Sequence, residues 1–145
     1  CEEVPIDHFT IPIGRGKIVR QGTSVTIVSY GNAVNTSLEA ADALEGEGIS
    51  VELIDLRTIK PWDTELVLDS VARTGRLVVT HEAPVIGGVG AEIVATVVEQ
   101  AGYLLETPPV RVGHPDMVWG QAKLEAYSLV NTSRVAAAVR SVLAD

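Results

Sequence analysis

Residues 50–93 read SVELIDLRTIKPWDTELVLDSVARTGRLVVTHEAPVIGGVGAEI, and this stretch decides the fold. Residues 51–56 and 77–80 are short apolar runs rich in Val, Ile and Leu, a composition typical of buried strands. A helix is expected between them, with Asp63 as its N-cap and its end near Ala72. A glycine-rich turn then opens another helix. The order strand, helix, strand, helix predicts a parallel α/β sheet.

The flanking sequence extends this pattern on both sides. Further strands are expected at residues 17–19, 25–29 and 110–112, the first of them at a sheet edge. Further helices are expected at residues 33–45, at 89–101, and from an Asn131 or Thr132 cap to the C-terminus. The second of these helices has four apolar residues that we expect on its core side. They are Ile93, Val94, Val97 and Val98.

The predicted fold class is α/β, with three layers (α/β/α) and a mostly parallel sheet of about five strands. The 145 residues are enough for one domain. Residues 1–16 mix acids, prolines and glycines without a period, so we expect an extended lead-in there and the domain at 17–145. With a single Phe, the core must be filled by Val, Ile, Leu and Ala, which suits a sheet covered on both faces.

The charge and the cysteine content exclude several classes of function. A net charge of -8 argues against nonspecific binding to nucleic acid or to an anionic membrane, and it is compatible with a basic protein partner. Cys1 is the only cysteine, which rules out an internal disulfide and a cysteine-based metal site. No apolar run has the length of a membrane span, and nothing resembles a signal peptide. Because the first residue is not Met, we expect a fragment or a processed product.

The glycine loop is the first candidate site. Gly87, Gly88 and Gly90 place flexible backbone before a helix N-terminus, an arrangement that often binds anions. Their spacing does not match the dinucleotide pattern G-x-G-x-x-G. We favour a simpler interpretation, in which the glycines permit a tight turn and close packing of helix on sheet. A ligand or subunit contact remains the alternative.

His81 and Glu82 form the second candidate. They lie at the carboxyl end of a predicted parallel strand, where α/β folds place ligands. Catalysis would need a third group and a substrate pocket, and neither is evident from the sequence. We therefore favour a polar pair that bonds the loop or a neighbouring subunit. The three histidines share no metal-ligand spacing, and neither a nucleophile elbow nor a P-loop is present.

Five ordered pieces of the sequence carry a family resemblance. They are IPIG–GKIVR–GT (11–23), IDLRTIKPWD (54–63), SVARTGRLVVTHEAP (70–84), GGVGAEI (87–93) and PPVRVGHPD (108–116). With them the chain resembles the C-terminal domain of the beta subunit of thiamine-diphosphate-dependent 2-oxo acid dehydrogenases, of the branched-chain or pyruvate type. These enzymes belong to the wider transketolase family, so the resemblance implies a transketolase C-terminal-domain-like fold. The family's Pro-aromatic-Pro stretch is replaced here by DMVWG (116–120), which puts any partner contact of that segment in doubt.

The resemblance implies that the reactive chemistry lies outside this chain. In such beta subunits an N-terminal domain binds the aminopyrimidine of thiamine diphosphate and supplies the activating glutamate. The alpha subunit holds the diphosphate and Mg²⁺. We therefore expect no catalytic, cofactor-binding or metal-binding residue among these 145 residues. The cofactor and Mg²⁺ would belong to the holoenzyme, whose partners here are the alpha subunit and a second beta subunit.

The resemblance also implies docking of the small basic subunit-binding domain of the lipoyl acyltransferase. An acidic residue before the last strand and the C-terminal carboxylate receive that domain's basic side chains in related enzymes. The matching positions are Glu106, in LLETPPVRV, and Asp145. Charge-assisted hydrogen bonds suit such a contact. The alternative for Glu106 is a solvated loop acid.

The leading interpretation is thus a noncatalytic domain for subunit association and docking in a dehydrogenase that decarboxylates a 2-oxo acid and transfers the acyl group to lipoamide. We expect it in the bacterial cytoplasm rather than the mitochondrial matrix. Two alternatives remain. One is an independent α/β module that binds an anionic ligand at residues 87–90, and the other is the C-terminal domain of a different transketolase-like enzyme.

Overall fold

A five-stranded sheet forms the centre of the computed structural model, which describes residues 6–118 and 125–144. Its strands are β1 (Lys17–Arg20), β2 (Val25–Ser29), β3 (Val51–Asp55), β4 (Leu77–Pro84) and β5 (Val110–His114). They lie in the order β1-β3-β2-β4-β5. Strands β2 to β5 pair in parallel, and only the edge strand β1 is antiparallel, to β3. The predicted mostly parallel sheet is confirmed.

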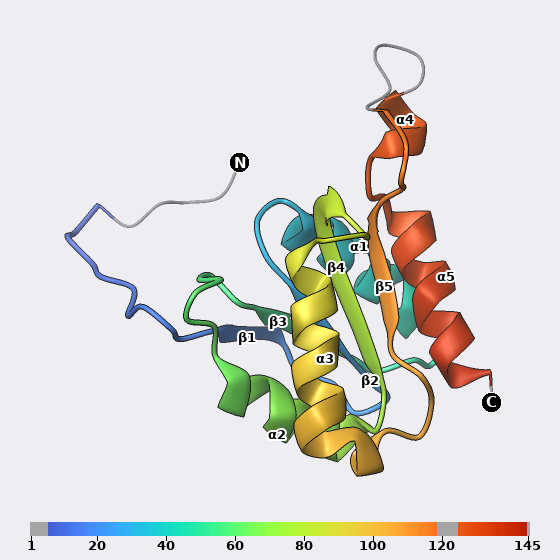
Figure 1. The fold of residues 1–145 in the computed structure, drawn as a ribbon, viewed down its shortest axis with the longest axis horizontal. Coiled ribbons are helices and arrows are strands. Elements are labelled where there is room, and N and C mark those ends of the chain that lie inside the picture. The colour runs from blue at the N-terminus through green and yellow to red at the C-terminus, as the bar shows by residue number, and fades with distance from the viewer. Residues whose placement is uncertain (1–5, 119–124, 145) are drawn as a thin grey trace.

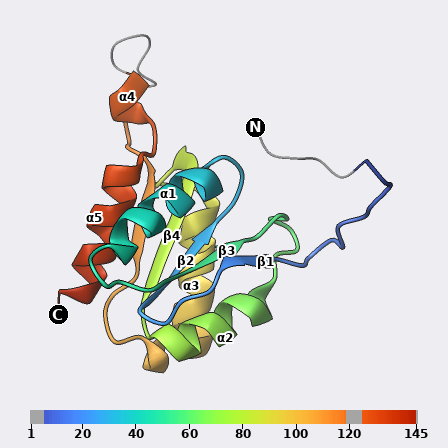
Figure 2. The same cartoon turned by 180° about the vertical axis from the view of Figure 1, so that it is seen from behind.

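Helices cover both faces of this sheet, as Figures 1 and 2 show. One face carries α1 (Ala33–Glu45) and α5 (Thr132–Leu143), and the other carries α2 (Thr64–Thr74) and α3 (Val89–Ala101). A 3₁₀ helix, η1 (Gly102–Leu104), follows α3, and a short helix, α4 (Glu125–Ser128), precedes α5. The three-layer arrangement is therefore confirmed. No helix in the described ranges has both the length and the apolar character needed to span a bilayer.

The central strand β2 is buried on both faces. Val25 and Ile27 pack among α1 and α5, whereas Val28 packs among α2 and α3, because successive side chains in a strand point to opposite faces. All five residues of β2 are buried. This explains its continuous apolar sequence, which is typical of a parallel sheet covered by helices on both sides.

A buried polar network joins α2 to the sheet. The hydroxyl of Thr26 lies 2.7 Å from those of both Ser70 and Thr74. Ser70 also donates to the buried carboxylate of Glu52, which forms an ion pair with Arg73. Because each buried polar atom of this network has a partner, the network sets the position of α2 without the penalty of an unpaired group.

The helix boundaries follow from local chain chemistry. Asp63 caps α2 by accepting a hydrogen bond from the amide of Leu66 at 3.3 Å, and Gly75 ends that helix in the left-handed conformation, with a φ of 66°. For α5, the cap is Asn131, whose side chain accepts from the amide of Arg134 at 2.9 Å. Asn131, rather than Thr132, is thus the N-cap.

Four expectations need correction. β5 runs to His114 rather than ending at Val112. β4 does not end at Thr80 but continues to Pro84, where it pairs with His114 beyond an irregularity in the ladder. α2 runs on to Thr74 rather than ending near Ala72. The expectation that Val98 faces the core is wrong, since the side chain is 48% exposed. The sheet buries only a narrow stripe of α3, and Val98 lies about 100° around the helix from the buried Val97.

The last residues of the lead-in are hydrogen-bonded to the domain. The amide of Gly14 donates to the hydroxyl of Thr58 at 2.9 Å, and that of Gly16 donates to Asp63 at 3.0 Å. Before them, the described part of the lead-in runs away from the sheet in both views (Figures 1 and 2). The domain boundary after residue 16 stays a prediction.

Candidate functional site

The carboxyl edge of the sheet has a switch point between β2 and β4. The chain leaves β2 for β3 on one side, and then crosses back to β4 on the other side. Parallel α/β folds bind ligands in the crevice that this reversal creates. Here two side chains of the chain itself occupy the position. Tyr30 stacks on the fully buried His81, with ring centroids 5.8 Å apart and an interplanar angle of 23°.

Both ring nitrogens of His81 are engaged in hydrogen bonds. Nδ1 lies 3.0 Å from the carbonyl oxygen of Ala83, and the amide of Gly90 donates to Nε2 at 3.1 Å. Since a carbonyl only accepts and an amide only donates, the proton must be on Nδ1. The bond from Gly90 therefore requires a neutral imidazole, since a protonated Nε2 could not accept it. Burial lowers the pKa of His81, an effect that the Ala83 carbonyl opposes and the charge of Arg111 reinforces.

The glycine loop is shaped by this imidazole. A Cβ atom at Gly90 would lie 2.4 Å from Nε2 of His81, and one at Gly88 would lie 2.8 Å from Cε1. On the neighbouring strand, a Cβ at Gly113 would lie 2.7 Å from the carbonyl oxygen of Ala83 and 3.2 Å from Cε1 of His81. Three glycines thus surround one ring. This geometry supports the close-packing interpretation, and it adds Gly113, which the sequence analysis missed.

The same contacts reduce the capacity of the α3 N-terminus to bind an anion. The N-cap, Gly88, has no side chain, and His81 takes its place by accepting the hydrogen bond from Gly90. The amide of Ala91 donates to the carbonyl of Gly88. An anion would have to displace the imidazole to reach the amide of Gly90. Glu82 is exposed, and within the described residues it shows no hydrogen bond or ion pair with His81.

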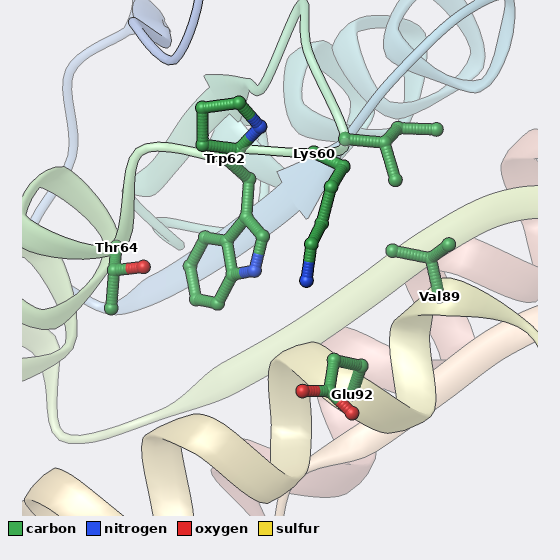
Figure 3. A pocket seen from close by; sticks show the side chains of 7 residues that line it. Lys60, Trp62, Thr64, Val89 and Glu92 are labelled. Carbon is green, nitrogen blue, oxygen red and sulfur yellow. The ribbon is translucent and has the colours of Figure 1, made fainter.

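A pocket of about 350 Å³ lies between the loop after β3 and the start of α3. In Figure 3, Lys60 and Trp62 extend from the loop toward the helix, and Val89 and Glu92 face them. One cation and one anion give this pocket no preference for an anionic ligand. Its other lining residues are Ile59, Pro61 and Thr64. No signal in the sequence predicted it, because it depends on how the loop packs against α3.

The geometry offers no metal centre in the part of the chain that the structure describes. No group of three or more His, Cys, Asp or Glu side chains is placed to hold an ion there. The polar groups at the carboxyl edge are instead bonded to one another, and the buried hydroxyl of Ser29 lies 3.4 Å from that of Thr80. This contact packs the carboxyl ends of β2 and β4 together.

Glu106 lies at the opposite, amino-terminal edge of the sheet. Its amide donates to the carbonyl of Gly75 at 2.8 Å, and its Oε2 lies 2.5 Å from a terminal guanidinium nitrogen of Arg76. The carboxylate is thus ion-paired within the chain, although its side chain is 58% exposed. Asp145 lies outside the described residues. Because Glu106 lies at the amino-terminal edge, the structure does not bring it together with His81 or the glycine loop at the carboxyl edge.

Gly90→Ala is expected to destabilise the fold by about 1–3 kcal/mol, because the new Cβ overlaps His81 Nε2 and displaces α3 or the ring. Urea unfolding measures the loss. The control is Gly102→Ala, at the other end of the same helix, where φ is -56° and the nearest atom would lie at 3.7 Å. Equal stability of the two variants would contradict the packing described for His81.

The stability of the fold is also expected to fall as the pH drops below about 6.5, the ordinary pKa of histidine. Because folding lowers the pKa of His81, the unfolded chain binds the proton more readily there. The free energy of unfolding should fall by up to about 1.4 kcal/mol per pH unit until the folded pKa is reached. Unfolding of the wild type and of His81→Gln between pH 7.5 and 5.5 measures this slope.

The slope should be lost in His81→Gln and kept in His8→Gln, which alters an exposed residue of the lead-in. If the wild type and His81→Gln show parallel pH profiles, the neutral buried imidazole does not contribute in the way described.

Three comparisons with known proteins agree with this fold. A family model described as "Transketolase, C-terminal domain" matches residues 14–135. The Bacillus subtilis pyruvate dehydrogenase E1 component subunit beta is 41% identical over 98% of this chain and 44% of its own length. The mitochondrial 2-oxoisovalerate dehydrogenase subunit beta 2 of Arabidopsis thaliana is 42% identical over 98% of this chain and 39% of its own. The chain thus spans less than half the length of these relatives.

Solved structures give the same result. A structure described as a split gene transketolase, inactive beta4 tetramer, superimposes with a TM-score of 0.83 at 38% identity, over 99% of this chain and 46% of that one. A 2-oxoglutarate:ferredoxin oxidoreductase from Magnetococcus marinus shares the fold alone, with a TM-score of 0.58 at 13% identity over 89% and 19%. The chain belongs to the transketolase C-terminal domain family and is homologous to the beta subunits of pyruvate and 2-oxoisovalerate dehydrogenases.

Proposed function

We propose that this chain is the subunit-association and partner-docking domain of a 2-oxo acid dehydrogenase beta subunit. The observation that carries the proposal is the 41–42% identity to such beta subunits over 98% of the chain. The complete enzyme would decarboxylate a 2-oxo acid and transfer the acyl group to lipoamide. A location in the bacterial cytoplasm is part of the proposal.

The cofactor of that reaction, thiamine diphosphate with Mg²⁺, finds no fitting residues at the switch point or in the pocket beside α3. The crevice at the switch point is filled by Tyr30 and His81, and the pocket beside α3 has one cation and one anion. No cluster of described acidic or histidine side chains suits a divalent ion. The proposal therefore assigns cofactor binding and catalysis to the rest of the enzyme, with the alpha subunit and a second beta subunit as partners.

Exposed apolar side chains at the carboxyl edge support a role in subunit association. Ile59 and Ile86 lie in the loops that follow β3 and β4, and both are exposed, as is Ile13 at the end of the lead-in. Large apolar side chains on one edge of a domain are typical of an interface. The similar structure described as a beta4 tetramer is consistent with such contacts.

Charge supports docking of the basic subunit-binding domain at the amino edge. The chain carries a net charge of -8. Glu106 presents an exposed carboxylate there, and Asp145 would add a second acidic group if it lies beside it. Basic side chains of the acyltransferase domain would form charge-assisted hydrogen bonds with these acids.

One similar structure supports a second candidate function. The similar structure at 38% identity is described as a transketolase, so the second candidate is the C-terminal domain of another transketolase-like enzyme. An assay of the assembled enzyme separates the two, since a dehydrogenase acylates a lipoyl domain from a 2-oxo acid and a transketolase transfers a ketol group between sugars.

Isolated from its partners, the chain is expected to show no stoichiometric binding of thiamine diphosphate, with or without Mg²⁺, because the proposed cofactor site lies on the rest of the enzyme. Isothermal calorimetry checks this, with the assembled alpha and beta subunits as the positive control. Saturable binding to the isolated chain at one site per molecule would place part of the cofactor site here and contradict the proposal.

Glu106→Lys is expected to weaken binding of the recombinant subunit-binding domain to the full chain by about tenfold at low salt, which corresponds to ~1.4 kcal/mol. The loss should shrink in high salt, because ions screen a partly exposed contact. Calorimetry at two salt concentrations measures both.

Glu65→Lys is the matched control. It makes the same change of charge at an exposed residue in the first turn of α2, at the end of that helix away from Gly75. Unchanged affinity in Glu106→Lys, or an equal loss in Glu65→Lys, would reject Glu106 as a docking residue.

A further inference from the structure

We infer that Arg76 is a positioning residue that joins Glu106 to the end of α5 and so assembles one docking surface from two distant segments. The inference rests on the proposed docking function and adds a residue to it. Arg76 lies between the C-cap of α2 and the first residue of β4. Its side chain is 22% exposed, much less than that of Glu106 at 58%.

The guanidinium of Arg76 makes two contacts in two directions, an ion pair and a hydrogen bond. A terminal nitrogen contacts Oε2 of Glu106 at 2.5 Å, and Nε donates to the carbonyl oxygen of Val142 at 3.1 Å. The first bond reaches the loop before β5, and the second reaches the last turn of α5. A planar guanidinium carries donors on three nitrogens in a fixed plane and so reaches two separate acceptors, whereas the three donors of a lysine ammonium all lie on one atom.

Neighbouring contacts fix the same geometry. The hydroxyl of Thr107 donates to the same carbonyl of Val142 at 3.1 Å, and the amide of Glu106 donates to Gly75 at 2.8 Å. A Cβ atom at Gly75 would lie 2.8 Å from the carboxyl carbon of Glu106, so the acidic side chain lies directly over this glycine. Gly75 thus ends α2 and also leaves room for the carboxylate.

These contacts leave one oxygen of Glu106 for a partner. Oε2 faces Arg76, and no donor from the described residues bonds Oε1. The nearby last turn of α5 ends in carbonyl groups, which carry the negative end of the helix dipole. A lysine or arginine of a basic partner would therefore meet a carboxylate that is already ordered, and binding would cost less side-chain entropy.

This role differs from a simple effect of charge. If Arg76 acted only as a cation, its removal would make the surface more acidic and would strengthen binding of a basic partner. If Arg76 holds Glu106 in place, its removal lets the carboxylate and the end of α5 move, and the complex dissociates faster. The two interpretations predict opposite changes in affinity.

The test is to measure association and dissociation rates of the recombinant subunit-binding domain on the full chain by surface plasmon resonance. Arg76→Gln is expected to raise koff by about fivefold without lowering kon. Arg76→Lys should fall between this variant and the wild type, because lysine can keep one of the two bonds. The matched control is Arg20→Gln, which removes an ion-paired arginine of 20% exposure on β1 and should leave both rates unchanged.

The outcomes separate the inference from the docking proposal. Binding of Arg76→Gln that is as tight as the wild type, or tighter, would overturn the positioning role, while Glu106→Gln could still show that docking occurs there. If Glu106→Gln binds normally, docking at this edge fails, and the role of Arg76 fails with it. If Arg76→Gln unfolds, less of the protein on the sensor surface can bind, but koff of the remaining molecules does not rise. Arg76→Lys then provides the decisive rates.

Discussion

A neutral imidazole at the carboxyl edge of the sheet is the interaction on which the rest of this structure depends. His81 joins its own strand through Ala83, the start of α3 through Gly90, and the end of β2 through the ring of Tyr30. The bond from Gly90 needs the uncharged ring, because only an unprotonated Nε2 can accept it, and burial favours that state. The ring also replaces the side-chain cap that α3 lacks. Packing this tight leaves no room for even a methyl group at Gly90.

The two edges of the sheet differ in the side chains that they expose to a partner. At the carboxyl edge, polar side chains bond to one another beneath exposed apolar loops, an arrangement suited to contact with another subunit. At the amino edge, Glu106 remains exposed but is held in place by Arg76. Because the carboxyl and amino edges lie at opposite ends of β4, one small domain can take part in two different contacts. This division agrees with the proposed role in organising subunits.

Most of the secondary structure could be predicted from local chemistry. Residues 33–45 and 89–101 were expected as helices and form α1 and α3 at those bounds, because glycines flank them and apolar residues recur within them. Predictions failed where the outcome depended on neighbours. β4 runs past Thr80 because β5 is available to pair with it, and Val98 stays exposed because none of the described elements covers that side of α3. The glycine loop was predicted to permit close packing, but its partner, His81, had been considered separately as a polar pair with Glu82.

The sequence alone thus determined the order of the elements, the caps of α2 at Asp63 and Gly75, and the family. Each of these depends on residues close together in the chain. Only the tertiary structure decided which side chains meet. Arg76 and Val142 are 66 residues apart, and the hydrogen bond between them exists because β4 and α5 pack together. Such contacts arise from the strand order and the packing of helices on the sheet, and no local pattern encodes them.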